Sequence, residues 1–155
     1  MISERDLQRG MTTTRGIWFA LFASLLVYVI IAPFLFDTAG VSFSQESYRT
    51  LRLSLFVCAF LTMILTWFLR KHLLTAPQGK KAGNATQHPA VARYLSVMMV
   101  AMGLSEAIAV YGLVLYVLGK SSQDLYILTL LSAGAMTLYF PKKEEIIELA
   151  KRFPA

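Results

Sequence analysis

The chain has 155 residues, of which 56% are hydrophobic and only 15% charged, and its formal net charge is +6. The apolar residues are gathered into four near-continuous blocks instead of being spread with amphipathic periodicity, which is typical of a membrane protein and argues against a soluble domain. The cations cluster at the ends of these blocks, which argues against a nucleic-acid-binding face, and the single cysteine, Cys58, excludes a disulfide within the chain.

The first apolar block predicts a transmembrane helix over residues 16–36, after a polar tail that carries three arginines. Trp18 and Phe19 stand where the chain would enter the membrane, which suits an interfacial aromatic belt. The block begins late, runs long and lacks a small-residue cleavage site at its end. We therefore expect a retained signal anchor, not a cleaved signal peptide.

The second block predicts a span over residues 53–69. Small or polar residues recur in it at every fourth position, which puts them on one face of a helix: Ser54, Cys58, Thr62 and Thr66. Small side chains let helices approach closely in lipid, and hydroxyls can hydrogen-bond across the contact. We interpret this face as a packing surface. If it meets the third span, Thr62 lies at a depth from which it could hydrogen-bond Glu106.

The third block, residues 94–118, carries a single acid, Glu106, near its midpoint. At about 1.5 Å per residue the block is long enough for a hydrocarbon core of roughly 30 Å, so Glu106 is expected close to the bilayer midplane. An ionised carboxylate there costs at least about 2.5–3.5 kcal/mol, so such residues are usually paired or belong to an ion or proton pathway. No Lys or Arg lies inside the four spans, and any counter-charge must come from another chain.

The last part of the chain predicts a short fourth span over residues 125–140 and, over 141–155, a cytoplasmic tail with a short amphipathic helix. That helix could lie on an anionic inner leaflet or be solvated. Twelve of the fifteen Lys and Arg residues lie in the N-terminal tail, the long middle loop with its flanks, and the C-terminal tail. By the positive-inside rule both termini are cytoplasmic. The expected fold is all-α, with residues 1–155 forming one polytopic domain of four spans in two hairpins, in the inner (plasma) membrane.

Residues 103–114, Gly-Leu-Ser-Glu-Ala-Ile-Ala-Val-Tyr-Gly-Leu-Val, resemble the carboxylate helix of the rotary ATPase proteolipids, which are subunit c of F-type ATP synthases and the related V-type proteolipid. The resemblance implies that Glu106 takes up and releases the transported ion. Sodium-binding members of that family have a hydroxyl residue after the acid and a glutamine on the partner helix. Here Ala107 follows and no span holds a glutamine, so the resemblance points to protons. The first two spans lack the family's glycine-rich helix, and the acid stands on the third helix instead of the last.

The sequence therefore predicts a proteolipid-like membrane subunit in which Glu106 is reversibly protonated, with Ser105, Tyr111 and Thr62 as its local modulators. Its partners would be the lipid bilayer and either further copies of the chain or other membrane subunits of a larger proton-translocating assembly. The alternative is a non-catalytic scaffold or assembly protein in which Glu106 only fixes helix packing; a small dimeric transporter is a third class. No catalytic constellation is present, and we expect no enzyme activity, cofactor or metal.

Overall fold

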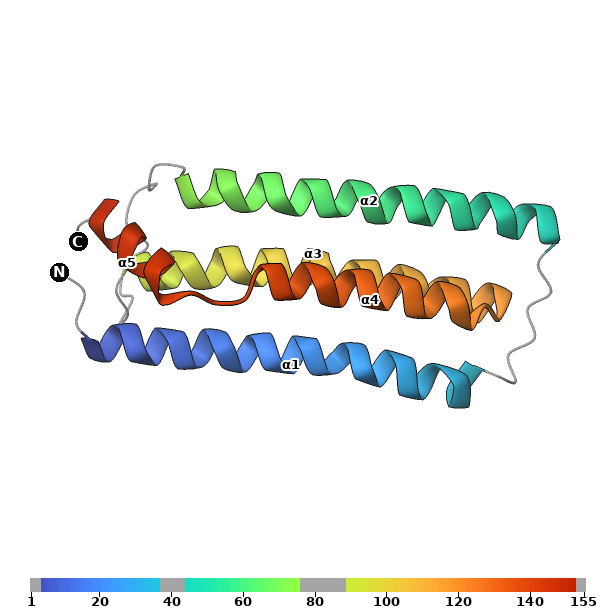
Figure 1. Ribbon diagram of the computed structural model, residues 1–155, viewed down its shortest axis with the longest axis horizontal. Helices are drawn as coiled ribbons and strands as arrows, with labels where there is room; N and C mark the ends of the chain where they lie inside the picture. The colour runs from blue at the N-terminus through green and yellow to red at the C-terminus, as the bar shows by residue number, and fades with distance from the viewer. Residues whose placement is uncertain (1–3, 37–43, 76–88, 153–155) are drawn as a thin grey trace.

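The computed structural model describes residues 4–36, 44–75 and 89–152, and the regular structure in these ranges is entirely α-helical (Figure 1). The helices are α1 (Glu4–Phe36), α2 (Gln45–Thr75), α3 (Pro89–Gly119), α4 (Ser122–Leu138) and α5 (Lys143–Arg152). The prediction of an all-α fold is confirmed. The predicted connection around residues 37–43, the middle loop at 76–88 and the end of the tail at 153–155 lie outside the described residues.

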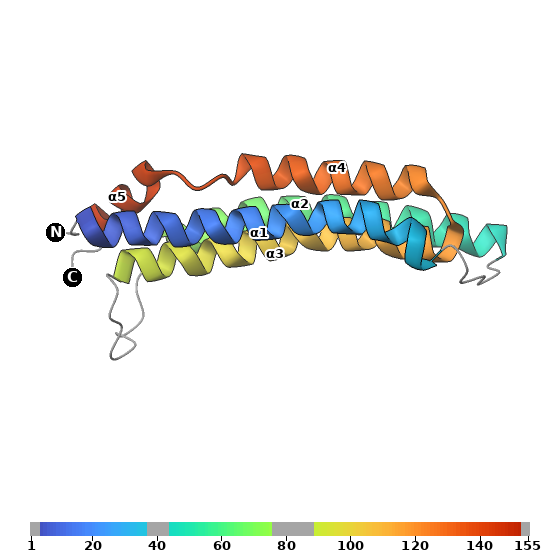
Figure 2. The same cartoon turned by 90° about the horizontal axis from the view of Figure 1, so that it is seen from below.

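Helix α3 is the centre of the arrangement, because it contacts α1, α2, α4 and α5. In Figure 1, α1 and α2 run along opposite sides of α3, and the turned view in Figure 2 places α4 to one side of the other long helices. Helices α1 and α2 make no extensive contact with each other in the described part of the chain. The expected pairing of the first two spans as a hairpin is not confirmed, since each packs mainly on α3.

Three of the described helices, α1, α2 and α3, are long and apolar enough to cross a membrane. They indicate a multi-pass membrane protein. Much of the outer surface of α1 and α2 consists of exposed apolar side chains, among them Ile30 and Phe34 on α1 and Leu61 and Phe68 on α2. An apolar surface of this extent is costly in water but is the expected surface in lipid. Helix α4 has 17 residues and is shorter than the other three.

The helices extend beyond the apolar blocks that predicted them. Helix α1 already begins at Glu4, inside the segment predicted as a polar tail. The hydroxyls of Thr12, Thr13 and Thr14 donate to carbonyl oxygens four residues earlier, so these side chains do not compete with the helical backbone. Hydropathy marks the part of a helix that lies in hydrocarbon, and it does not mark where the helix ends.

Trp18 is buried in the bundle, not exposed at an interface as predicted. Its indole Nε1 donates to the carbonyl oxygen of Met136 at 3.0 Å, and its ring stacks on Phe22 with the centroids 4.8 Å apart. Phe140 meets the same ring edge-on at 5.1 Å. Trp18 thus fastens α1 to the end of α4, while the neighbouring Phe19 remains 61% exposed.

The predicted packing face of α2 is also largely wrong. Ser54 and Cys58 are exposed, and of that face only Thr66 is buried. The contact with α3 and α4 is made instead around Ala59, which packs in a cluster with Ile108 and Leu128. The serine and threonine hydroxyls of this face all donate to carbonyl oxygens of α2 itself, so they do not need a partner helix.

Helix α5 has the predicted amphipathic pattern, but its apolar face packs against protein. Ile146 and Leu149 are buried in the cluster that includes Met11 and Tyr94, and Ile147 stays 38% exposed. An ion pair between Arg70 Nη2 and Glu145 Oε2, at 2.6 Å, joins α5 to the end of α2. The helix is therefore docked on the bundle at the end where α1 begins (Figure 1).

Candidate functional site

Glu106 lies near the middle of α3, and its half-buried side chain is directed towards α1. Ser24 Oγ donates to Glu106 Oε1 at 2.7 Å, and Tyr28 Oη donates to the same oxygen at 2.8 Å. Ser24 and Tyr28 are four residues apart, so they share one face of α1. One carboxylate oxygen is thus held by two hydroxyls from a neighbouring helix.

The two hydroxyls leave the protonation state of the carboxyl open. If Glu106 is ionised, both donate to a charged oxygen and stabilise it; if Glu106 is neutral with its proton on Oε2, both can still donate to the carbonyl oxygen. The Ser24 oxygen also lies 2.6 Å from the carbonyl oxygen of Leu21. Because a hydroxyl has a single hydrogen, Ser24 donates either to Leu21 or to Glu106 at any moment.

No ion pair involves Glu106 among the described residues; the three ion pairs found there join Arg52 to Asp124, Arg70 to Glu145 and Arg152 to Glu148. The Glu106 carboxyl is therefore solvated by hydroxyl dipoles and not by a cation of the described chain. A carboxyl held in this way can exist in the neutral and in the ionised form without breaking an ion pair.

None of the three residues predicted to assist Glu106 hydrogen-bonds to it in the described structure. Ser105 is buried against α4, where its Oγ donates to Ala101 and its carbonyl oxygen accepts from Ser132 Oγ at 2.6 Å. Tyr111 is half-buried beside the Ala59 cluster, on the α2 side of α3. Thr62 donates to the carbonyl oxygen of Cys58 at 2.8 Å and not to Glu106.

Sequence reasoning expected the residues that assist Glu106 on α2 and on α3 itself, whereas its hydrogen-bond partners lie on α1. The two residues that do contact it, Ser24 and Tyr28, are polar positions one turn apart in an otherwise apolar span, and this spacing was the available signal. The same spacing was present in α2, and nothing in the sequence states which helix faces the acid.

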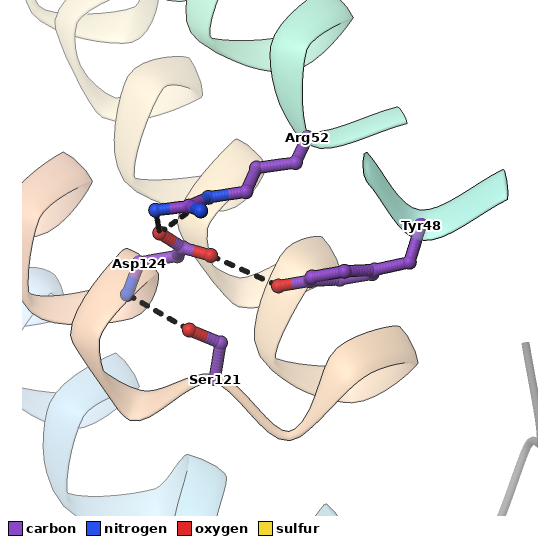
Figure 3. Close-up of polar contacts among 4 residues, drawn as sticks. All are labelled: Tyr48, Arg52, Ser121 and Asp124. Atoms are coloured by element: carbon purple, nitrogen blue, oxygen red, sulfur yellow. Dashed lines mark hydrogen bonds and ion pairs between the residues drawn. The ribbon is translucent and has the colours of Figure 1, made fainter. Parts of the chain in front are cut away.

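A second carboxyl, Asp124, lies in the first turn of α4 and was not among the predicted site residues. Its side chain is only 1% exposed. Arg52 Nε and Nη2 donate to Oδ1 at 3.0 and 2.8 Å, and Tyr48 Oη donates to Oδ2 at 2.9 Å (Figure 3). Ser121 caps the helix, since its side chain accepts a hydrogen bond from the Asp124 backbone N–H.

We call these four residues the Asp124 cluster: Tyr48, Arg52, Ser121 and Asp124. The cluster has a structural role. It ties the first turns of α2 to the first turn of α4, where an acid is also favoured by the helix dipole. Gly119 makes room for it, because a Cβ at that position would lie 2.0 Å from the Tyr48 ring. Both oxygens of the Asp124 carboxyl are occupied and a cation is in place, whereas Glu106 has hydroxyl partners on one oxygen and no cation among the described residues.

The described residues bring together no group of three or more His, Cys, Asp or Glu side chains that could hold a metal ion. Comparison of the chain with protein-family models, with curated protein sequences and with solved structures finds no match.

Proposed function

We propose that the chain is a proteolipid-like integral membrane subunit in which Glu106 binds and releases a proton inside the bilayer. The observation that supports this most directly is the setting of the carboxyl: near the middle of a membrane-spanning helix, hydrogen-bonded by Ser24 and Tyr28, and without a cation among the described residues. Acids at that depth commonly serve proton pathways. The local resemblance of residues 103–114 to the carboxylate helix of rotary ATPase proteolipids agrees with this role.

Four spans are part of the proposal, with α4 as the fourth. Its 17 residues extend over about 26 Å, which is close to the roughly 30 Å of hydrocarbon. Its exposed side chains are apolar at Ile127, Leu130 and Leu138. The distribution of cations favours cytoplasmic termini, and the membrane in this proposal is the inner (plasma) membrane. Further copies of the chain or other subunits would complete a proton-translocating assembly.

The Ser24 hydroxyl can reorient when Glu106 gains or loses a proton. When Glu106 is ionised, Ser24 and Tyr28 both donate to it. When a proton binds at Oε1, the carboxyl can donate to Ser24 Oγ, and Ser24 turns its own hydrogen to the Leu21 carbonyl oxygen, which lies 2.6 Å away. The two arrangements differ by one hydroxyl rotation, so a change of protonation needs no movement of α1 against α3.

The alternative is a scaffold or assembly protein, and one observation favours it. The hydrogen bonds from Ser24 and Tyr28 join α1 to α3, so a permanently neutral Glu106 would serve as a fastener between these helices. In that case Glu106→Gln should preserve both the fold and the function, because the glutamine carbonyl accepts the same two hydrogen bonds.

Labelling with a hydrophobic carbodiimide separates the two functions, because such reagents attack protonated carboxyls inside membranes. Purified protein in lipid is labelled across a range of pH and read by mass spectrometry, with Glu106→Gln marking the background. A proton-binding site gives labelling at Glu106 that fades as the pH rises and the carboxyl ionises. Ser24→Ala should make the labelling persist to higher pH, because the ionised form loses a donor, whereas the same change at Ser96, whose hydroxyl donates only to Ala92, should not.

Labelling of Glu106 that does not change with pH, or that never occurs while exposed carboxyls react, would remove the proton-binding role. The scaffold would then be the remaining function of this site.

A further inference from the structure

A cavity of about 240 Å³ lies between the last turn of α2 and α5. Its lining combines two cations, two carboxylates and a hydroxyl, with two leucines beside them: Lys71, Arg152, Glu145, Glu148, Thr75, Leu74 and Leu149. The lining charges balance, and the cavity offers both a cationic and an anionic group within a small volume. Such a lining is complementary to a small zwitterion with an apolar continuation.

The position of the cavity indicates where that zwitterion comes from. The cavity opens at the end of α2, a helix long and apolar enough to cross a membrane. Trp67 is 59% exposed one turn before Lys71, and the Lys71 ammonium lies 5.5 Å from the centre of its ring. An exposed tryptophan followed by a lysine that extends past it is the usual pattern at a membrane–water interface. The cavity therefore lies at the level of the lipid headgroups.

The charged groups of the cavity are available to a ligand to different degrees. Lys71 forms no ion pair with a carboxylate of the described residues. Glu148 and Arg152 pair with each other on the surface of α5, with side chains 63% and 53% exposed, and such exposed pairs are weak enough to exchange partners. Glu145 is held by Arg70, and it retains further acceptor capacity.

We propose that this cavity binds the headgroup of an ethanolamine phospholipid. The phosphate lies against Lys71 and Arg152, the primary ammonium donates to Glu148 and Glu145, and the leucines contact the glycerol end of the lipid. A primary ammonium carries three hydrogen-bond donors, whereas the quaternary ammonium of a choline lipid carries none, so the carboxylates select ethanolamine. An anionic headgroup without an ammonium would leave the carboxylates unmatched.

The experiment measures lipid retention by native mass spectrometry of the full chain, released from nanodiscs that hold equal amounts of ethanolamine, choline and glycerol phospholipids. Hydrogen bonds to charged groups carry the selection, so we expect ethanolamine lipid to be retained about tenfold over choline lipid. The double variant Lys71→Gln, Glu148→Gln should abolish that preference. The matched control, Glu46→Gln with Arg49→Gln, removes one acid and one cation from the opposite end of α2 and should retain it.

Soluble glycerophosphoethanolamine, added in excess, tests the source of the headgroup; a lipid site should keep its lipid in the presence of this competitor. The proposal is overturned if ethanolamine and choline lipids are retained equally, if the anionic glycerol lipid exceeds both, or if the soluble headgroup displaces the lipid. It is also overturned if the control variant loses the preference together with the cavity variant. None of these outcomes depends on the protonation of Glu106.

Discussion

The close contact between α3 and α4 at Gly112 can be tested by Gly112→Ala, which adds a single methyl group. A Cβ at this position would lie 3.0 Å from Leu128 Cβ and 3.3 Å from the Cα and carbonyl oxygen of Leu125. These atoms belong to the backbone of α4 or adjoin it, so they cannot rotate away and the two helices must separate. Overpacking of this kind costs about 1–3 kcal/mol, and the better helix propensity of alanine returns about 1 kcal/mol. We expect Gly112→Ala to lower the free energy of unfolding by about 1 kcal/mol.

Gly103 provides the matched control, because it lies on the same helix and a Cβ there would meet no atom within 4 Å. Gly103→Ala keeps the propensity gain without the collision, so the two variants should differ by about 1–3 kcal/mol. The assay is reversible unfolding in mixed micelles with rising dodecyl sulfate, followed by far-ultraviolet circular dichroism. Equal stability of the two variants would refute the close approach of α3 and α4 at Gly112.

Two further changes test the polar contacts at the two ends of the bundle. Gly119→Ala should push the Tyr48 ring away and break its hydrogen bond to Asp124. In the same assay the free energy of unfolding should fall by about 1.5–3 kcal/mol. An unchanged free energy of unfolding would contradict the packing of that ring. Arg70→Gln removes the ion pair to α5 and should raise the rate of amide hydrogen exchange in α5 about fivefold, which corresponds to about 1 kcal/mol. The control Arg152→Gln removes an exposed ion pair and should leave the exchange rate of α5 nearly unchanged. Equal exchange in the two variants would show that the Arg70 pair does not hold α5.

The sequence was sufficient to predict the three helices that are long and apolar enough to cross a membrane, because a run of apolar residues reports directly on the solvent that surrounds it. It was not sufficient to predict their ends. Glu4 and Thr75 are exposed residues of helices whose backbone hydrogen bonding continues past the apolar run, which hydropathy does not record. The burial of Trp18 was missed for a related reason, since an aromatic residue at the edge of a span fits an interface and a packed bundle equally well.

The sequence identified the central residue of the candidate site, Glu106, but not the residues that contact it. Glu106 stood out because a lone acid in an apolar run is costly. Its partners Ser24 and Tyr28 lie about eighty positions away, and their contact depends on how α1 is rotated about its axis, which small-residue spacing on α2 could not indicate. Asp124 was overlooked because its partners Tyr48 and Arg52 lie on another helix; the pattern Ser121-x-x-Asp124 predicts the helix start, not the ion pair.

The central position of α3 has a consequence for biosynthesis. Helices α1 and α2 emerge from the ribosome first, but they make no extensive contact with each other, and the helix on which both pack is still unmade at that moment. The first two segments must therefore remain separate in the lipid or be held by the insertion machinery. Only after α3 has been made can Glu106 meet Ser24 and Tyr28, so the contacts that hold α1 and α2 in the bundle form late in synthesis.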